Sequence, residues 1–288
     1  MALSDNVRGV LYMNASMLAF TVNDTFIQSV TKTMPLFQAI AVRGMLTTVA
    51  LLMIARLMHG SITMWPNPSA RRILALRTFA EIASTALFLL ALMQLPLANL
   101  SAIMQCLPLA VTLFAAVFLG ERVGGRRLLA VLIGFVGVML IIQPGADSFN
   151  RWSLMGLASV AFIVLRDLST RKFSADIPSV TVALWASIGV TAMGFVVTAF
   201  QGWPPMTLTQ FALVFAASIA LIAGYMFAVM VMRVGDVSFV APFRYTSLLW
   251  AMVFGLVLYG TFPDGWTLIG SAIVVVTGIY SLWTERSR

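Results

Sequence analysis

The stretch that decides the fold runs from Pro96 to Gln143 and reads PLANLSAIMQCLPLAVTLFAAVFLGERVGGRRLLAVLIGFVGVMLIIQ. Two apolar runs are joined here by the short charged turn GERVGGRR. Because an α-helix rises about 1.5 Å per residue, about 20 apolar residues cross the hydrocarbon core of a bilayer, which is roughly 30 Å thick. The stretch therefore predicts a transmembrane hairpin.

The same window recurs 140 residues further on, in Asp236–Trp283, with eight identities and no gap, among them Gly120 with Gly260. The first turn holds Glu121 and three arginines, whereas its counterpart, GTFPDGW, contains no basic residue. The positive-inside rule places the first turn in the cytoplasm and the second outside. Two copies that face opposite sides form an inverted repeat, which requires an odd number of spans in each copy.

Composition limits the class of protein. The chain is 60% hydrophobic and only 10% charged, with a mean hydropathy of +0.97, which predicts a polytopic membrane protein. The net charge of +8 comes without interleaved aromatic and basic motifs, so topology and anionic lipid headgroups explain it better than nucleic acid. A single cysteine, Cys106, and a single histidine, His59, leave no internal disulfide and no cluster for a metal or a haem. We therefore expect no cofactor.

Ten candidate spans each end at a turn or a charge signal. They are residues 7–30, 36–57, 70–93, 96–119, 126–143, 152–172, 179–200, 208–232, 236–259 and 265–284. The loops between them are too short for an extramembrane domain, and the N-terminus runs into the first span without a signal-peptide cleavage site. The predicted fold is an all-α integral membrane protein with ten transmembrane helices, arranged as two inverted five-helix repeats, residues 1–145 and 146–288.

Basic residues fix the expected orientation. With the N-terminus inside, fourteen of them fall on the cytoplasmic side: Arg8, Arg56, Arg71, Arg72, Arg77, Arg122, Arg126, Arg127, Arg166, Arg171, Lys172, Arg233, Arg286 and Arg288. Only Lys32 and Arg151 fall outside. The bias predicts that both termini are cytoplasmic.

Charged residues inside the spans mark candidate functional positions, because each costs at least about 2.5 to 3.5 kcal/mol at mid-bilayer. Asp24 and Arg43 are equally distant from the loop between them, so antiparallel helices bring them to the same depth in the outer half. They form either a stabilising ion pair or an extracellular gate or substrate anchor. Arg166 and Asp167 are near enough to the cytoplasm to snorkel, which is the simpler interpretation.

Glu81 and Arg244 lie deeper, some eight to eleven residues from the cytoplasmic ends of their spans, or roughly 12 to 16 Å. Matching depths lead to the hypothesis that they pair across a cavity when its inner side is closed, and that a substrate carboxylate competes with Glu81 for the guanidinium. Polar stripes at helical spacing support a central path: Asn14, Thr21, Thr25 and Gln28; Glu81, Ser84, Thr85 and Phe88; Ser101, Gln105 and Thr112.

Two prolines interrupt spans in corresponding segments. Pro108 removes the amide that would bond to Met104, and Pro242 stands near the start of span nine. Broken helices in both repeats point to a transport site, whereas the simpler alternative is a harmless kink. Small residues in spans five and ten, Gly134, Gly137, Gly270 and Gly278, permit close helix packing, as a buttress or as an oligomer face.

Four segments carry a family resemblance. ALMQLPLANLSAI, FLGERVGG, GFVGVMLII and PLFQAIAVRGML resemble the first repeat of the drug/metabolite transporter superfamily, EamA type. Within it, the sequence looks closest to bacterial aromatic amino-acid exporters of the inner membrane. The resemblance implies ten helices in two units, a central cavity, and an outward route for aromatic and perhaps other neutral amino acids. The second repeat departs from the pattern, with Thr261 in place of Glu121.

The sequence thus predicts a secondary transporter that exports small amphipathic solutes, most of all amino acids, across the bacterial inner membrane by alternating access. Candidate substrate-binding residues are Asn14, Glu81, Phe88, Gln105, Tyr225, Arg244, Tyr245 and Trp250. Candidate gating or ion-pair residues are Asp24, Arg43, Pro108 and Pro242. The expected partners are a small-molecule substrate and the lipid bilayer, with the chain a monomer or a homodimer.

Three alternatives stay open on the sequence alone. A channel, or a carrier of quaternary ammonium drugs or of nucleotide sugars, fits the same fold, because fold does not fix function. An enzyme is disfavoured, since the sole cysteine has no histidine near it in sequence and no metal cluster exists. The chain has no ATP-binding motif, so a substrate gradient or a proton gradient is the expected energy source.

Overall fold

The computed structural model describes residues 5–59, 68–119, 124–143, 150–170, 179–231 and 240–286 of the 288-residue chain. The boundary predicted between residues 145 and 146, and the turn residues Glu121 and Arg122, lie outside these ranges. Within them the chain is helical, without a strand, as predicted.

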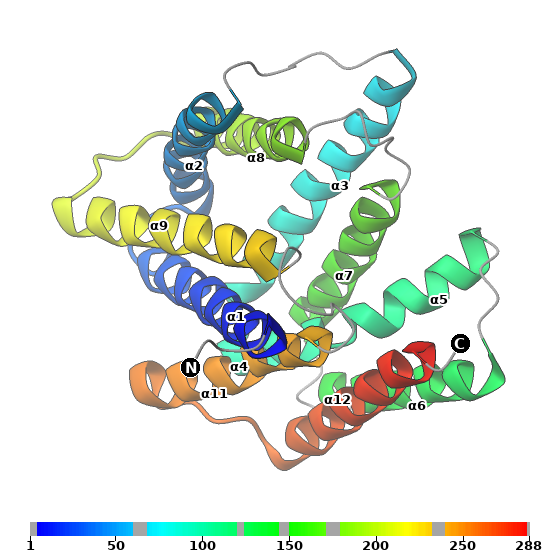
Figure 1. The fold of residues 1–288 in the computed structure, drawn as a ribbon. Coiled ribbons are helices and arrows are strands. Elements are labelled where there is room, and N and C mark those ends of the chain that lie inside the picture. Colours follow the sequence, from blue (N-terminus) through cyan, green and yellow to red (C-terminus); the bar gives the residue numbers. More distant parts are fainter. Residues whose placement is uncertain are drawn as a thin grey trace.

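Twelve helices make up the described fold (Figure 1). They are α1 (Asp5–Val30), α2 (Leu36–His59), α3 (Pro68–Leu92), α4 (Leu97–Met104), α5 (Leu107–Leu119), α6 (Gly125–Ile142), α7 (Arg151–Thr170), α8 (Ser179–Gln201), α9 (Leu208–Val231), the 3-10 helix η1 (Ala241–Tyr245), α11 (Thr246–Tyr259) and α12 (Gly265–Arg286). Each predicted span corresponds to one helix, except that spans four and nine each consist of two. Ten spans are therefore confirmed as helices.

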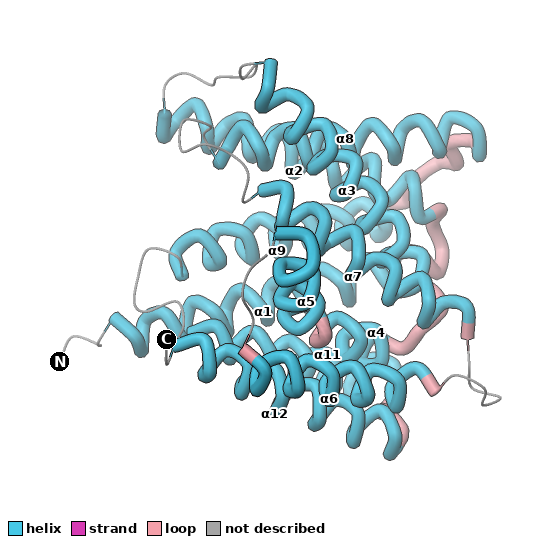
Figure 2. Tube along the Cα trace, turned by 90° about the vertical axis from the view of Figure 1, so that its right-hand side faces the viewer, coloured by secondary structure: helices cyan, strands magenta, loops and turns pink. Residues whose placement is uncertain are grey.

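Length and composition qualify six of these helical stretches to cross a membrane, and α6 and α12 contain shorter apolar stretches. The helices run side by side, and the short connections gather at their ends (Figure 2). α1 begins and α12 ends on the same side of the bundle. We call that side the inner end and the opposite side the outer end, following the predicted orientation.

The packing of the helices shows the inverted repeat. α1 packs on α9, α3 on α7, α2 on α8 and α6 on α12. A shift of 140 residues exchanges α1 with α7 and α3 with α9, so the first two pairs are equivalent to each other. The other two pairs each join a helix to its own counterpart, and counterparts that pack antiparallel are related by a two-fold axis in the membrane plane.

Glycines let α6 and α12 approach closely. A Cβ on Gly137 would lie 2.8 Å from the carbonyl oxygen of Gly270, and a Cβ on Gly270 would lie 2.5 Å from that of Gly137. Gly134 faces Thr277, and the 140-residue shift turns this contact into the observed one between Gly137 and Val274. These glycines therefore serve packing within the chain, which is the buttress interpretation of the sequence.

The interruption predicted in span four is present. Gln105 and Cys106 separate α4 from α5, and the Cys106 amide bonds to Ile103 three residues back. Pro108 occupies the first turn of α5, where a helix needs no amide donor, so it begins a helix instead of kinking the interior of one. Pro242 likewise lies in the first turn of η1. The 140-residue shift superposes the break after Gln105 on the boundary between η1 and α11.

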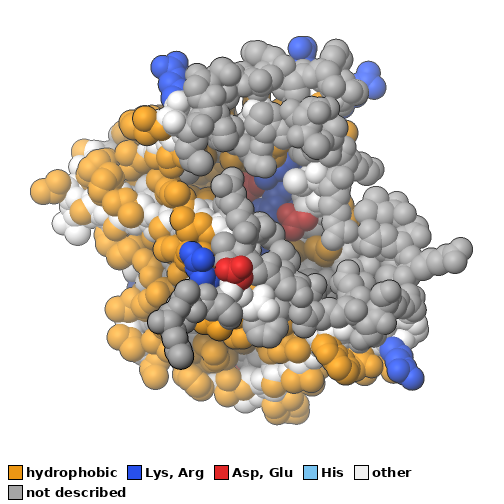
Figure 3. All heavy atoms as spheres, viewed as in Figure 1, with side chains coloured by type: hydrophobic (Ala, Val, Ile, Leu, Met, Phe, Trp, Pro, Cys, Tyr) orange, Lys and Arg blue, Asp and Glu red, His pale blue; other side chains and the backbone are white. Residues whose placement is uncertain are grey.

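The hydrophobic core lies toward the outer end. Its largest fully buried side chains come from the outer ends of α1, α2, α3 and α4: Ile27, Ile40, Leu89, Leu92, Leu100 and Ile103. The inner end differs, because a space-filling view from that side shows a hollow with charged side chains in its depth (Figure 3). The fold is thus packed at the outer end and open at the inner end.

Candidate functional site

Four charged side chains form a cluster between α3 and α7: Arg77, Glu81, Arg166 and Asp167. One carboxylate oxygen of Glu81 lies 3.5 Å from Nη2 of Arg77, one turn away on the same helix. The other lies 3.3 Å from Nη1 of Arg166 on α7. Nη2 and Nε of Arg166 both contact Oδ1 of Asp167 at 2.8 Å. Glu81 therefore bridges two arginines, and through Arg166 it joins the first repeat to the second.

Arg77 also holds α3 against its neighbours. Its Nε donates to Oγ1 of Thr170 at 3.1 Å, and its Nη1 donates to the carbonyl oxygen of Val182 at 3.5 Å. Only 14% of its side chain is exposed. A buried guanidinium with neutral acceptors on two helices depends on Glu81 for charge compensation.

Tyr225 on α9 shows that water reaches this region. It lies within electrostatic range of Glu81, Arg166 and Arg43, which belong to three other helices. It is nevertheless 47% exposed, and its ring meets that of Phe20 edge-on at 5.3 Å. A tyrosine surrounded by charges on three helices yet open to solvent lines a water-accessible cavity. This cavity corresponds to the hollow of Figure 3.

Arg43 and Asp24 lie near each other, but an asparagine stands between them. Arg43 is only 6% exposed, and its Nη1 donates to Oδ1 of Asn23 at 3.2 Å. Nδ2 of Asn23 in turn donates to Oδ1 of Asp24 at 2.8 Å. The Arg43 charge is close enough to act on Asp24. The polar chain thus ties α2 to α1 without a direct contact between the two charges.

The predicted pair of Glu81 and Arg244 is not formed in this structure. Glu81 faces α7, whereas Arg244 is exposed on η1, with its carbonyl oxygen bonded to Oγ of Ser247 at 3.1 Å. Equal depth along two helices does not fix which way each helix faces, and the prediction rested on depth alone. The sequence therefore assigned the wrong arginine to Glu81.

Gln105 and Tyr245 occupy equivalent positions in the two broken spans, and they meet. Nε2 of Gln105 donates to Oγ of Ser247 at 2.9 Å and approaches the carbonyl oxygen of Tyr245 at 3.4 Å. Gln105 and Tyr245 are 5% and 6% exposed. The Tyr245 hydroxyl packs against Gly278 and has no hydrogen-bond partner within the described chain. The structure thus buries this pair where the two breaks meet.

The remaining predicted contacts are not brought into the charged cluster. Nδ2 of Asn14 donates to the carbonyl oxygen of Val10 on its own helix at 2.9 Å. Phe88 is partly buried and packs against the hydrophobic core. Trp250 is partly buried too, and its indole nitrogen is buried without a partner in the described residues.

Sequence reasoning missed Arg77, Arg166, Asp167 and Asn23 as members of the site. Arg77 and Glu81 are four residues apart, a spacing at which opposite charges meet on one helix face, and this signal was available. Arg166 and Asp167 were interpreted as snorkelling because they are close to the end of a span. The charge rule uses position along the chain, so it cannot separate an arginine at the surface from one that lines a cavity.

The fold and the site together define a polytopic membrane protein whose two inverted halves surround a charged, water-accessible cavity. The sequence profile of the EamA-like transporter family matches residues 7–143 and again residues 150–284. The chain belongs to this family, which has two repeats of five helices.

Similar proteins of known activity are membrane transporters. A riboflavin transporter from Vibrio cholerae is 30% identical over 74% of this chain and 72% of its own length. An S-adenosylmethionine uptake transporter from Rickettsia bellii is 28% identical over 66% of this chain and 65% of its own length. A pseudopaline exporter from Pseudomonas aeruginosa is 24% identical over 96% of this chain and 97% of its own length. None of these three is named for amino acids, the substrates that the sequence resemblance suggested.

The fold itself recurs in a solved crystal structure, with a TM-score of 0.66 at 20% identity, over 97% of this chain and 99% of the other. These comparisons make the chain a multi-pass membrane transporter of a bacterial family and, like its relatives, a carrier of a small molecule.

Proposed function

We propose that this transporter carries small amphipathic solutes that bear a carboxylate, along the cavity between α1, α3, α7 and α9. The observation behind the proposal is the position of Glu81 between two arginines, beside the exposed Tyr225. Charges inside a membrane protein are costly and usually mark the path of a substrate or an ion. Here their mutual compensation holds the cavity ready in the absence of a solute.

The geometry suggests how a solute would be held. A guanidinium presents a planar fork of donors that matches a carboxylate, so a solute carboxylate can replace Glu81 at Arg166. Phe20 and Tyr225 supply aromatic surface for an apolar side chain. Because Glu81 belongs to the first repeat and Arg166 to the second, this exchange breaks one contact between the two halves. Binding would thereby favour the rocking motion of alternating access.

We further propose that aromatic and other neutral amino acids are the first substrates to test, and that the direction is export. The relatives carry riboflavin, S-adenosylmethionine and pseudopaline in their names, and both uptake and export occur among them. The alternative is a carrier of quaternary ammonium drugs or of nucleotide sugars. Two arginines in the cluster and Arg43 beside it favour a solute with a negative group over a quaternary cation.

The same proposal covers orientation and gating. We infer from the charge bias that the chain lies in the bacterial inner membrane with both termini in the cytoplasm, as a monomer or a homodimer. Residues 1–145 and 146–288 would act as the two moving units. The chain of Arg43, Asn23 and Asp24, together with the breaks beside Pro108 and Pro242, would supply the gate and the hinges.

A panel of solutes tests this function directly. Purified protein in liposomes preloaded with one unlabelled solute should accumulate the same labelled solute. The panel consists of L-phenylalanine, L-tryptophan, riboflavin, S-adenosylmethionine, a nucleotide sugar and a quaternary ammonium dye. Exchange of L-phenylalanine or L-tryptophan above the level of empty liposomes is the expected result. Exchange of the dye alone would refute the carboxylate solute.

A further inference from the structure

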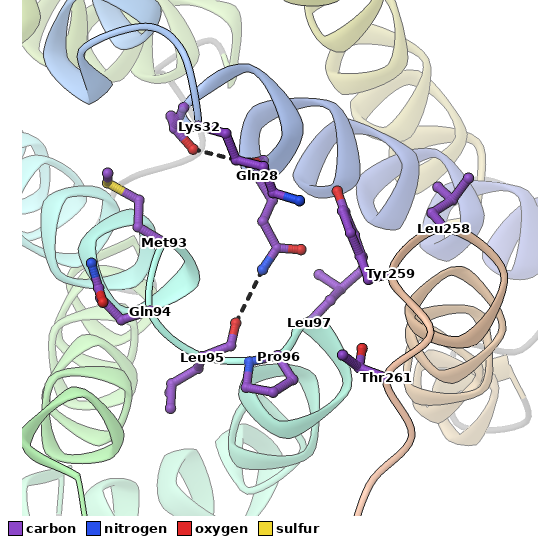
Figure 4. A pocket seen from close by; sticks show the side chains of 11 residues that line it. Gln28, Lys32, Met93, Gln94, Leu95, Pro96, Leu97, Leu258, Tyr259 and Thr261 are labelled. Carbon is purple, nitrogen blue, oxygen red and sulfur yellow. Dashed lines mark hydrogen bonds between the residues drawn. The ribbon is translucent and has the colours of Figure 1, made fainter.

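A cavity of about 650 Å³ lies at the outer end, away from the charged cluster. The end of α1, the turn between α3 and α4, and the end of α11 surround it (Figure 4). Both repeats therefore contribute to its wall. Small-molecule sites have volumes of about 300 to 1,000 Å³, so the cavity is large enough for a metabolite.

Lys32 is the one charged residue among those that line this cavity. Its Nζ lies 4.3 Å from the centre of the Tyr259 ring, over the aromatic face. Within the described residues no carboxylate lies at ion-pair distance from it. An aromatic face attracts an ammonium group but leaves its N–H donors unoccupied, so Lys32 can accept an anionic partner.

The rest of the wall is amphipathic. Its apolar side chains are Met93, Leu95, Pro96, Leu97 and Leu258, and its neutral polar ones are Gln28, Thr31, Gln94, Tyr259 and Thr261. A wall with one cation, several hydrogen-bonding groups and a broad apolar surface suits a small solute with an apolar body and a carboxylate. That is the same class of solute that the central cavity suits.

The Tyr259 hydroxyl closes the space between this cavity and the interior. It lies 2.6 Å from Oγ of Ser29 and donates to the carbonyl oxygen of Thr25 at 3.0 Å. These contacts fasten α11, in the second repeat, to α1, in the first. Below them lie buried core residues such as Ile27. A solute could pass between the two cavities only if this contact opened.

Gln28 forms a second closure, and one that is incompletely satisfied. Its Nε2 donates to the carbonyl oxygens of Leu92 and Leu95 at 2.8 and 3.0 Å, on the side away from Tyr259 (Figure 4). Its Oε1 is buried without a partner in the described chain. A buried acceptor without a donor destabilises this closed arrangement relative to one in which water or a solute reaches it. The closure is therefore poised to open.

We propose that the outer cavity is a second solute subsite, which binds the carboxylate of an amphipathic solute through Lys32 above a gate formed by Tyr259 and Gln28. The inference rests on the proposed transport function and adds to it a binding step at the outer face. A solute that leaves the central cavity would be held here before release, and a solute added from outside would bind here first.

Protection of an introduced cysteine tests the subsite. Gln94, which is exposed at the rim, is replaced by cysteine in a chain in which the buried Cys106 is replaced by alanine. An impermeant maleimide then labels Gln94→Cys in liposomes. L-Phenylalanine and 3-phenylpropionate should slow the labelling, whereas phenethylamine, which lacks the carboxylate, should not.

Variants of the lysine give the decisive comparison. Lys32→Gln should raise the L-phenylalanine concentration that gives half-protection about tenfold or more, as expected for one lost charge-assisted hydrogen bond, and Lys32→Arg should retain protection. The matched control is Arg151→Gln, because Arg151 is also a base at the outer end, lies 4.6 Å from the Trp152 ring, and does not line the cavity. It should leave protection unchanged.

Parallel exchange measurements separate the two levels of inference. If the reporter protein exchanges L-phenylalanine but the solute gives no protection, or if Lys32→Gln and Arg151→Gln behave alike, the subsite is refuted and the transport function stands. If the protein neither exchanges nor is protected by L-phenylalanine, the proposed amino-acid substrate is refuted together with the subsite.

Discussion

Replacement of Glu81 by glutamine removes the charge that compensates two arginines while keeping the shape of the side chain. Arg166 would keep its contacts with Asp167 at 2.8 Å, so its charge would stay compensated. Arg77 would not, because Glu81 is the one carboxylate at ion-pair distance from it in the described chain. Its remaining acceptors, Thr170 and the carbonyl of Val182, are neutral. The destabilisation should therefore come from Arg77.

The expected magnitude lies between two limits. Removal of one partner from a fully buried ion pair costs about 3 to 5 kcal/mol, because a lone charge is left in a low dielectric. An exposed pair contributes about 0 to 1 kcal/mol. The side chains of Arg77 and Glu81 are 14% and 12% exposed, beside a cavity that water enters. We expect Glu81→Gln to lower the free energy of unfolding by about 2 kcal/mol.

A double-mutant cycle in detergent measures this effect. Wild type, Glu81→Gln, Arg77→Gln and the double variant are unfolded with increasing denaturant under identical conditions. The double variant should regain about half or more of the lost stability, because the lone guanidinium is gone. If Glu81→Gln shifts stability by less than about 0.5 kcal/mol, as a surface substitution does, and the cycle shows no coupling, the assignment of a compensated buried cluster is wrong.

Other predictions address packing, capping, hinge and topology. Gly270→Ala forces a methyl group against the backbone of α6 and should cost about 1 to 3 kcal/mol in the same unfolding assay, whereas Gly125→Ala, with no atom within 4 Å of the added Cβ, should not. Asp264 caps α12 by accepting a backbone N–H bond from within its first turn at 2.8 Å, so Asp264→Ala should cost about 1 kcal/mol at pH 7. That hydrogen bond holds the pKa of Asp264 below its usual value, so its stabilisation is present above the unfolded-state pKa and is lost as pH falls through the lowered one, and a pH titration should show the difference from wild type vanishing in acid. Pro108→Ala should restore an amide beside the break, join α4 to α5 and slow solute exchange in liposomes without loss of expression. Cysteines in place of Arg126 and Asp264 should react oppositely with an impermeant reagent in intact cells, and equal labelling would contradict the inverted orientation.

The fold was predictable because bilayer thickness and helical rise constrain it strongly. Long apolar runs identified the spans, and their ends differ from the observed helices by only a few residues, as where α1 begins at Asp5. The 140-residue repeat followed from glycines and from opposite charge at two turns. Pro108 predicted the break in span four, although the helix resumes at the proline itself. These features depend on position along the chain.

The candidate site was harder to predict because it depends on the direction in which each helix faces. Glu81 was recognised by its depth, but its partner was assigned to Arg244, which has a similar depth and faces elsewhere. Arg166 is near the end of its span, yet the packing of α7 on α3 turns it inward. Asn23, which carries the contact from Arg43 to Asp24, is an uncharged residue that no depth argument selects. Contacts between helices, and not positions within them, decide these cases.

The exchange of labelled L-phenylalanine in liposomes by Arg166→Gln, compared with wild type, tests the central claim most directly. Arg166 contacts Glu81 across the two repeats and is the proposed anchor for the solute carboxylate. The account predicts that wild type exchanges the solute and that the variant, reconstituted in equal amount, loses at least about tenfold in rate at low solute concentration. Phenethylamine should not inhibit the wild type, because it lacks the group that Arg166 binds. An Arg166→Gln protein that exchanges L-phenylalanine at the wild-type rate would contradict both the anchor and the proposed path.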